Sequence, residues 1–362
     1  MLIGIDTSRT TKPKLTGTEY YSVEIIKQML KIDSYDRFLL YSQLDPTPRL
    51  GKMPVNARIK LMPFPKLWTQ IRLSWEMLFR RPDVLFVPAH TIPIVHPKNT
   101  VVTLHDLGFK HFPELYSPKE LLYHNWSMNH GAGHAKLIIT PSEFTKKDLI
   151  KTYGIDPIKI RVIWHGYDRA SFVYDPNAKK KPYIFYIGRI EEKKNSLGMI
   201  KAYGLLRKEK SITHQLILAG APGFGFEKIK AEIESLPPEI QKDIKILGYV
   251  SQEKYIELLQ EADIFLFTTF FEGFGMPIVE AFACGTPVVT SNVTSMPEIA
   301  GDAALLVDPK KPLGIAAALS RLIHSSALKK QLIIKGRARA KLFSWEEAAE
   351  KTLAVIHEAG SK

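Results

Sequence analysis

The sequence of 362 residues contains one cysteine, Cys284. A single cysteine excludes an internal disulfide and most zinc sites, so the reducing cytoplasm is the expected compartment. Cys284 follows an apolar helical stretch, where a thiol is expected to pack rather than react. No apolar run approaches the roughly 18 residues that a membrane-spanning helix needs. The first apolar segment ends in a charge at Asp6, too early for a signal peptide.

Two sequence motifs of nucleotide chemistry are also missing. No D-x-D motif is present, so a metal ion bridging a bound diphosphate is not indicated and no cofactor is expected. The nearest approach to the dinucleotide fingerprint G-x-G-x-x-G is the incomplete match at residues 219–225, which makes a dehydrogenase a poor alternative. There is no zinc finger, RNA-binding aromatic motif or recognition-helix pattern either, so nucleic acid is not an expected partner.

The length fits two domains of ordinary size, each with its own core. Apolar, β-branched runs alternate with helical periodicity, a pattern typical of parallel sheets wound by right-handed crossovers. We therefore predict an α/β fold with two Rossmann-like, doubly wound domains. The first is expected to span residues 1–168 and the second residues 183–344. The polar segment 169–182, which contains two prolines and a lysine run, has the composition of a linker.

Strands are expected wherever short β-branched runs occur. In the first half the predicted strands are Leu2–Ile5, Phe38–Tyr41, Ile59–Leu61, Val84–Phe86, Thr100–Leu104, Leu137–Thr140 and Ile160–Ile163. In the second half they are Tyr183–Tyr186, Gln215–Ala219, Ile244–Leu247, Ile264–Phe267, Pro287–Thr290 and Ala304–Val307. Predicted helices include Glu19–Leu30, Ser142–Thr152, which Ser142 caps, and a terminal helix beginning near Ser344.

The stretch from residue 270 to residue 285 combines two carboxylates with glycines and a helix start. Pro277 suits the first helical position, because proline lacks the N–H that is unpaired there. Gly285 is placed to close the helix. Gly273 and Gly275 allow the backbone to approach a ligand, and the N–H groups of a helix start favour a diphosphate. The stretch is therefore predicted to hold a phosphorylated sugar.

The two carboxylates, Glu272 and Glu280, resemble the E-x7-E motif of retaining GT-B glycosyltransferases of family 4. Further stretches resemble successive blocks of that family, so the resemblance covers nearly the whole chain. These blocks are residues 102–107 and 163–168 in the first half, and 186–195, 247–250, 286–290 and 297–309 in the second. The resemblance implies two domains facing across a cleft, with the C-terminal helix, 345–362, packing back on the first.

The same resemblance implies roles for individual residues. Arg189 and Lys194 would contact the donor diphosphate, where fixed cations stabilise the negative charge that develops on the leaving group. His105 would contact the transferred sugar, with Asp106 ordering its loop. By themselves, a histidine after a strand and a basic turn are more often structural. The expected catalytic residues are Glu272, His105, Arg189 and Lys194, and the expected donor-binding residues are Gly17, Gly188, Arg189, Lys194, Tyr249, Val250, Glu272, Phe274, Gly275, Met276 and Glu280.

Within the expected donor site, Glu280 would bind the ribose, and Tyr249 and Val250 would edge the base. Glu272 and the backbone of residues 274–276 would lie against the sugar. Family members usually show two glycines near Gly17, and this chain has Glu19 near the second position.

The net charge of +13 is unevenly distributed. Residues 1–170 contain 24 Lys and Arg against 15 Asp and Glu, which is +9. An anionic phospholipid surface, or a lipid-linked acceptor with a pyrophosphate, fits such a surface. Residues 65–81 predict an amphipathic helix that carries Trp68, Arg72 and Trp75. It has two interpretations, a core-facing helix with a basic rim or an acceptor or membrane surface.

These observations predict a metal-independent, retaining glycosyltransferase that moves a mannose- or rhamnose-like sugar from a nucleoside diphosphate to an acceptor hydroxyl. The expected context is cell-surface polysaccharide or glycolipid assembly, in the cytoplasm or at the inner face of the membrane. Two alternatives are a nucleotide-sugar epimerase of the same fold and a non-catalytic module that binds sugar nucleotides or lipid surfaces. An epimerase would turn over its sugar without an acceptor.

Overall fold

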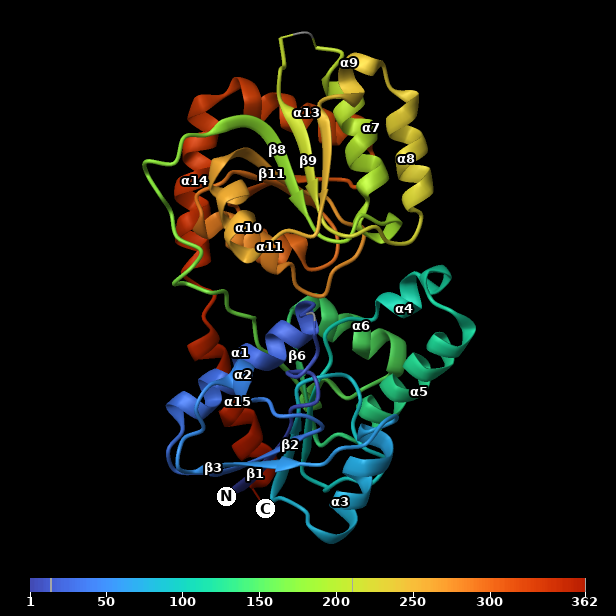
Figure 1. The fold of residues 1–362 in the computed structure, drawn as a ribbon, viewed down its shortest axis with the longest axis vertical. Coiled ribbons are helices and arrows are strands. Elements are labelled where there is room, and N and C mark those ends of the chain that lie inside the picture. Colours follow the sequence, from blue (N-terminus) through green and yellow to red (C-terminus); the bar gives the residue numbers. More distant parts are fainter. Residues whose placement is uncertain (14, 210, 362) are drawn as a thin grey trace. The chain divides into compact units, whose positions relative to one another are not determined.

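The computed structural model describes residues 1–13, 15–209 and 211–361, and the chain divides into two compact units. Unit 1 comprises Met1–Gly166 and Ser344–Lys362, and unit 2 comprises Tyr167–Phe343. The chain therefore enters unit 2 once and returns to unit 1 for its last helix (Figure 1). Residues 169–182, the expected linker, belong to unit 2. No helix among the described residues is long and apolar enough to cross a bilayer.

Unit 1 contains a seven-stranded parallel sheet with the order β3-β2-β1-β4-β5-β6-β7. Its strands are β1 (Leu2–Asp6), β2 (Arg37–Ser42), β3 (Ala57–Leu61), β4 (Val84–Val87), β5 (Thr100–Thr103), β6 (Leu137–Thr140) and β7 (Ile160–Val162). Every residue of β4, β5 and β6 is buried, as expected for parallel strands covered on both faces. All seven strands predicted for this half are present.

The helices of unit 1 begin and end at recognisable sequence signals. They are α1 (Gly17–Ile32), α2 (Thr47–Leu50), α3 (Ser74–Phe79), α4 (Gly108–His111), α5 (Pro118–His134), α6 (Glu143–Tyr153) and α15 (Trp345–Gly360), with 3-10 turns η2 (Pro113–Leu115) and η3 (Pro157–Lys159). The Ser142 side chain accepts from the Thr145 N–H at 3.1 Å and caps α6, which ends at Gly154 in the left-handed region. The C-terminal helix α15 packs on α1 and on β4, β5 and β6.

Unit 2 contains a six-stranded parallel sheet with the order β10-β9-β8-β11-β12-β13. Its strands are β8 (Lys181–Ile187), β9 (Gln215–Ala219), β10 (Ile244–Gly248), β11 (Ala262–Phe267), β12 (Val288–Ser291) and β13 (Ala304–Val307). Its helices are α7 (Ser196–Leu206), α8 (Phe226–Ser235), α9 (Pro238–Gln241), α10 (Gln252–Glu261), α11 (Met276–Ala283), α12 (Met296–Ala300), α13 (Pro312–His324) and α14 (Ser326–Ala340), with a 3-10 turn η4 (Glu192–Lys194). Figure 1 shows α7 and α8 on one side of this sheet and α10, α11 and α14 on the other. Both units are thus doubly wound, as predicted.

The helix predicted for residues 65–81 is wrong in extent and in part of its orientation. The structure has a π-helical turn, η1 (Thr69–Leu73), followed by the short helix α3. Trp68 lies before both and is buried, and its indole N–H donates to the Met62 carbonyl at 2.7 Å. Trp68 therefore belongs to the core of unit 1, and the aromatic surface of this segment begins further along the chain.

Candidate active site

The sheet of unit 2 reverses its direction of winding beside its first strand. From β8 the chain proceeds to β9 and β10 on one side, and later to β11, β12 and β13 on the other. Ligands of open α/β sheets bind beyond the carboxyl ends of the strands at such a switch point. The two loops at this point are residues 188–195, after β8, and 268–275, after β11. They contain most of the residues predicted for the donor site.

An ion pair joins these two loops. The Lys194 ammonium contacts the Glu272 carboxylate, and both side chains are largely buried. The Phe270 N–H donates to the Lys193 carbonyl at 3.1 Å, which holds the loops together through the backbone as well. The structure therefore brings together two residues that are 78 positions apart in sequence. A cation and a carboxylate are thus in contact at the switch point of this sheet.

Asn195 and Ser295 support these loops. The Asn195 side chain, in a left-handed backbone conformation, donates to the carbonyls of Thr268 at 2.9 Å and Pro309 at 2.8 Å. The Ser295 hydroxyl lies 2.9 Å from the carbonyl oxygens of both Glu272 and Phe274. Sequence reasoning did not assign either residue a role. Ser295 precedes the Pro297 block, but its partners are set only by the fold.

Arg189 differs from Lys194 in its exposure. Its side chain is 67% exposed, and its Nε atom lies 3.4 Å from a carboxylate oxygen of the buried Glu191. Gly188, just before it, has φ +145°, and a Cβ there would meet the Tyr186 hydroxyl at 2.6 Å. Glycine is therefore required at this turn. The Arg189 guanidinium therefore lies at the surface and is held by the contact of its Nε atom with Glu191.

Glu280 is buried inside helix α11, with only 8% of its surface exposed. The Tyr255 hydroxyl donates to Glu280 Oε2 at 2.6 Å. Burial raises the pKa of Glu280 to about 7, although the hydrogen bond from Tyr255 acts in the opposite direction. Tyr255 was not predicted as a site residue, because an amphipathic helix gives no signal for one such contact. Near neutral pH this carboxyl therefore exists in both protonation states.

The start of helix α11 is shaped by Gly275. This residue is the N-cap with φ +109°, and a Cβ would meet the Met296 methyl group at 2.7 Å. The helix begins at Met276, so Pro277 is its second residue and not, as predicted, its first. Gly285, in the left-handed region, follows the C-cap as predicted. The close packing leaves the backbone as the part of this turn that can face a ligand.

The remaining residues predicted for the donor site also follow the carboxyl ends of strands in unit 2. Tyr249 and Val250 follow β10, and the Tyr249 side chain is 80% exposed. Phe274 is buried and packs edge-on against Phe343, with ring centroids 5.8 Å apart. The Phe274 ring is thus held in the core, and the backbone contact with a sugar that was expected for this residue stays a prediction.

In unit 1, His105 follows strand β5 and is buried. Its Nε2 lies 3.0 Å from the Pro88 carbonyl oxygen, so Nε2 carries the proton and Nδ1 is the acceptor. Burial lowers the pKa of His105, which keeps the imidazole neutral. Asp106 accepts from the Gly108 N–H at 2.7 Å and thereby orders the loop, as predicted. A neutral ring with a fixed tautomer can accept a hydrogen bond from a hydroxyl.

Gly17 is the first residue of helix α1, where it was predicted. The Thr16 and Glu19 side chains form a capping box around it. Glu19 is buried and also lies 3.4 Å from Arg9. The carboxylate at the second glycine position of the resembling family therefore caps the helix. It occupies the place where an anion would otherwise approach the N–H groups.

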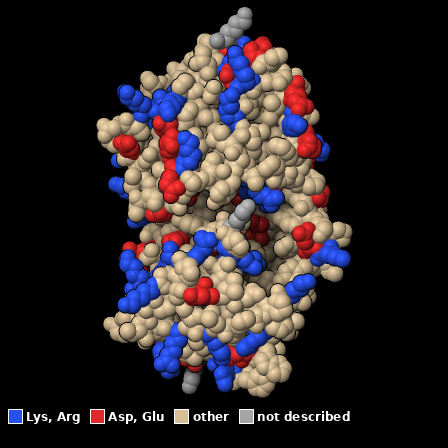
Figure 2. Space-filling model, in the orientation of Figure 1, with Lys and Arg blue, Asp and Glu red and all other residues tan. Residues whose placement is uncertain are grey.

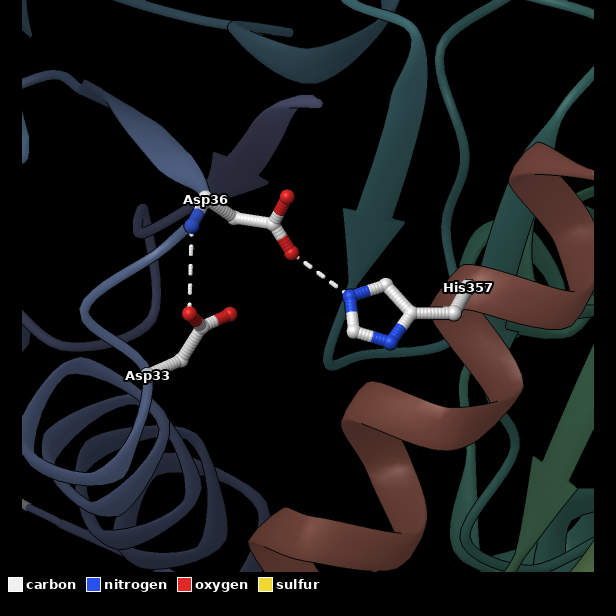
Figure 3. Close-up of side chains that lie close together, drawn as sticks. All are labelled: Asp33, Asp36 and His357. Atoms are coloured by element: carbon white, nitrogen blue, oxygen red, sulfur yellow. Dashed lines mark hydrogen bonds and ion pairs between the residues drawn. The ribbon is translucent and has the colours of Figure 1, made fainter.

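A group of side chains far from the site has the composition of a metal centre. Among the described residues, Asp33, Asp36 and His357 each offer a ligand atom within 4.8 Å of the others (Figure 3). His357 Nε2 lies 2.6 Å from Asp36, which also pairs with the amino group of Met1. These residues lie at the amino end of β2, opposite to the edge that carries His105. The Met1 amine and the His357 imidazole both contact the Asp36 carboxylate, so we interpret this group as an ion-pair network.

Comparisons with known proteins identify the family. A family model described as Glycosyltransferase Family 4 matches residues 16–171, and one described as Glycosyl transferases group 1 matches residues 170–339. The O-antigen chain mannosyltransferase B of Escherichia coli is 30% identical, over 94% of this chain and 96% of the relative.

Two solved structures share the fold at low identity. The sucrose-phosphate synthase of Thermosynechococcus elongatus has a TM-score of 0.77 and 16% identity, covering 99% of this chain and 98% of that one. HepE of Anabaena, solved with UDP-glucose, has a TM-score of 0.73 and 18% identity, covering 98% and 99%. Together with the two sheets and the whole-length relative, these matches show that the chain is a GT-B glycosyltransferase of family 4, glycosyl transferases group 1.

Proposed function

We propose that this glycosyltransferase moves mannose, or a similar hexose, from a nucleoside diphosphate to an acceptor hydroxyl in cell-surface polysaccharide or glycolipid assembly. The observation that carries the proposal is the group of Arg189, Lys194, Glu272 and Glu280 around the switch point of unit 2. The choice of mannose is supported by the Escherichia coli relative, which is named as a mannosyltransferase. The nucleotide-sugar donor is supported by HepE, which was solved with UDP-glucose.

In this proposal Arg189 and Lys194 receive the negative charge that develops on the departing diphosphate, and they take the place of a metal ion. Glu280 accepts hydrogen bonds from the ribose hydroxyls, and Tyr249 and Val250 border the base. The sugar lies against Glu272 and the backbone of residues 274–276. His105 of unit 1 accepts from a sugar hydroxyl through Nδ1.

We infer retention of configuration from the family to which the chain belongs. A double displacement needs a carboxylate nucleophile and a second acid–base carboxyl. Here Glu272 is paired with Lys194, and Glu280 is buried beside Tyr255. We therefore propose a front-side reaction, in which the acceptor hydroxyl attacks on the face that the phosphate leaves. The departing phosphate oxygen takes the hydroxyl proton, so no separate base is needed.

A thermal-shift screen of GDP-, UDP- and dTDP-sugars tests the donor assignment. A ligand at 100 times its dissociation constant stabilises a protein by about 2.7 kcal/mol, which is easily measured. The variant Glu280→Gln is compared with Glu239→Gln, an exposed residue of the same unit. We expect the nucleotide sugar of one base to stabilise the wild type and Glu239→Gln equally, and to stabilise Glu280→Gln less. Stabilisation that is equal in all three proteins would contradict the assigned site.

We also propose that unit 1 docks on an anionic bilayer that carries the acceptor. The apolar face consists of exposed side chains of one segment, namely Leu67, Ile71, Trp75, Leu78 and Phe79. Trp75 and Phe79 are 61% and 70% exposed, and their rings lie 5.3 Å apart. Lys66, Arg80 and Arg81 border this face. Aromatic rings settle at the headgroup level, and basic residues near an anionic bilayer contribute about 1 kcal/mol each.

The local arrangement carries this proposal more than the net charge does. Figure 2 shows Lys and Arg interspersed with Asp and Glu on the face that it draws. Sedimentation with anionic and neutral liposomes tests the idea on wild type, Trp75→Ala with Phe79→Ala, and Arg80→Glu with Arg81→Glu. We expect salt-sensitive binding to anionic vesicles that both double variants weaken. Binding that ignores lipid charge, or that survives both changes, would refute the proposal.

A further inference from the structure

Unit 1 has a cavity of about 230 Å³ that the donor site does not use. It lies at the carboxyl end of β1, where Asp6 lines it, and beyond β4, where Ala89 and Thr91 line it. These two strands are neighbours, and the chain winds away from them in opposite directions, through β2 and β3 or through β5, β6 and β7. The cavity therefore occupies the switch point of unit 1, the position at which open α/β sheets bind their ligands.

The charged side chains around this cavity favour an anion. Arg9, Lys12 and Lys66 line it, against one carboxylate, Asp6. Asp6 is buried, and burial raises its pKa above the ordinary value. Three basic residues that line one cavity, one of them also paired with Glu19, are an arrangement that can bind phosphate.

The other polar groups of the cavity suit hydroxyl groups. Gln70, which is buried, donates from its side-chain amide to the Tyr123 hydroxyl at 2.7 Å, and both residues line the cavity. Thr69 and Thr91 add hydroxyls of their own. Leu67 lines the same cavity and is exposed as the first member of the apolar face.

We propose that this cavity binds the phosphate or diphosphate group of the acceptor, which makes the acceptor a phosphorylated saccharide or saccharide lipid. The inference rests on the proposed function, since it assigns the second substrate of the same reaction. The cations Arg9, Lys12 and Lys66 hold the phosphate oxygens, and the amide and hydroxyl groups hold the adjoining sugar. Any lipid chain leaves the cavity past Leu67, towards the apolar face.

The test measures binding of inorganic pyrophosphate and of farnesyl diphosphate by calorimetry. It uses Arg189→Ala with Lys194→Ala as the starting protein, so that the donor site does not bind the probes. Into this protein we introduce Lys12→Glu with Lys66→Glu, or the control pair Lys98→Glu with Lys151→Glu, which are exposed lysines of the same unit outside the cavity. We expect the cavity pair to weaken both probes at least tenfold and the control pair to change them less than twofold.

The two probes separate the sources of the phosphate. Equal affinities for the two probes would show that the cavity recognises the phosphate groups alone. Tighter binding of farnesyl diphosphate would show that the lipid chain contributes at the apolar face. Thermal unfolding of each variant confirms that it folds. Absence of binding to the starting protein, or equal binding in the cavity and control variants, would overturn the inference.

Failure of the proposed function would look different. If the wild type transferred no sugar to any acceptor while the cavity bound pyrophosphate, the function would be wrong and the anion site would stand. If the wild type transferred sugar and Lys12→Glu with Lys66→Glu left its KM for a phosphorylated acceptor unchanged, the inference would fall and the function would stand. Donor affinity in that variant is expected to remain within twofold.

Discussion

Replacement of Glu280 by glutamine should stabilise unit 2 and weaken donor binding at the same time. The folded protein releases the Glu280 proton near pH 7, whereas an ordinary glutamate releases it near 4.5. Between these values the folded state holds the proton more tightly, so the free energy of unfolding falls as the pH rises. At 1.36 kcal/mol per pKa unit, the raised pKa lowers the free energy of unfolding, relative to a side chain that stays protonated, by about 3 kcal/mol at pH 8 and by about 1 kcal/mol at pH 5.

Glutamine keeps the size of the side chain and can still accept from the Tyr255 hydroxyl. We therefore expect Glu280→Gln to exceed the wild type in unfolding free energy by about 3 kcal/mol at pH 8 and by much less at pH 5. Urea unfolding followed by far-ultraviolet circular dichroism measures this difference. All five tryptophans lie in unit 1, so tryptophan fluorescence follows that unit separately.

Glu239→Gln, on the surface of the same unit, is the control. Its free energy of unfolding, plotted against pH, should run parallel to that of the wild type. The reasoning would be refuted if Glu280→Gln also ran parallel to the wild type between pH 5 and pH 8. A corresponding effect is expected in binding, because the ionised carboxylate is the stronger acceptor for ribose hydroxyls. Donor affinity of the wild type should rise with pH through about 7, and that of the variant should not.

Further predictions concern the reaction itself. Arg189→Ala and Lys194→Ala should each lower turnover about hundredfold or more, because each removes a fixed charge at the leaving group; a wild-type rate in either variant would remove that residue from the site. Glu272→Gln should lower the rate constant at saturating donor, whereas Glu280→Gln should mainly raise the donor KM, and identical kinetic profiles would contradict this division. Transfer should persist in excess EDTA, and loss of activity that Mg²⁺ or Mn²⁺ restored would show that a metal ion takes part.

The sequence predicts the strands of this protein better than its surface segments. All thirteen predicted strands are present, because buried parallel strands are short β-branched runs that few other structures explain. The prediction of one helix over residues 65–81 was wrong, because an amphipathic pattern shows that one face of a helix is buried but not at which residue the helix begins. The buried position of Trp68 depends on the Met62 carbonyl, which lies outside the pattern.

For the candidate site, too, the sequence predicts some features and not others. The glycines and the one proline of residues 273–285 could be assigned roles from the sequence, because backbone conformation limits the residues that can occupy such positions. The contacts of Glu280 with Tyr255 and of Glu272 with Lys194 join separate elements and depend on how the strands are ordered. The pKa of Glu280 is a further step removed, since it results from the packing around that carboxyl.

The placement of α15 in unit 1 has a consequence for the order in which a ribosome completes the two units. Unit 2 lies wholly between Gly166 and Ser344, so all of it has been synthesised before α15 emerges. Until then α1 and three strands of unit 1 lack the helix that packs on them. The second unit in the sequence can therefore finish folding first, while the first unit waits with apolar surface uncovered, a state that invites aggregation or chaperone binding.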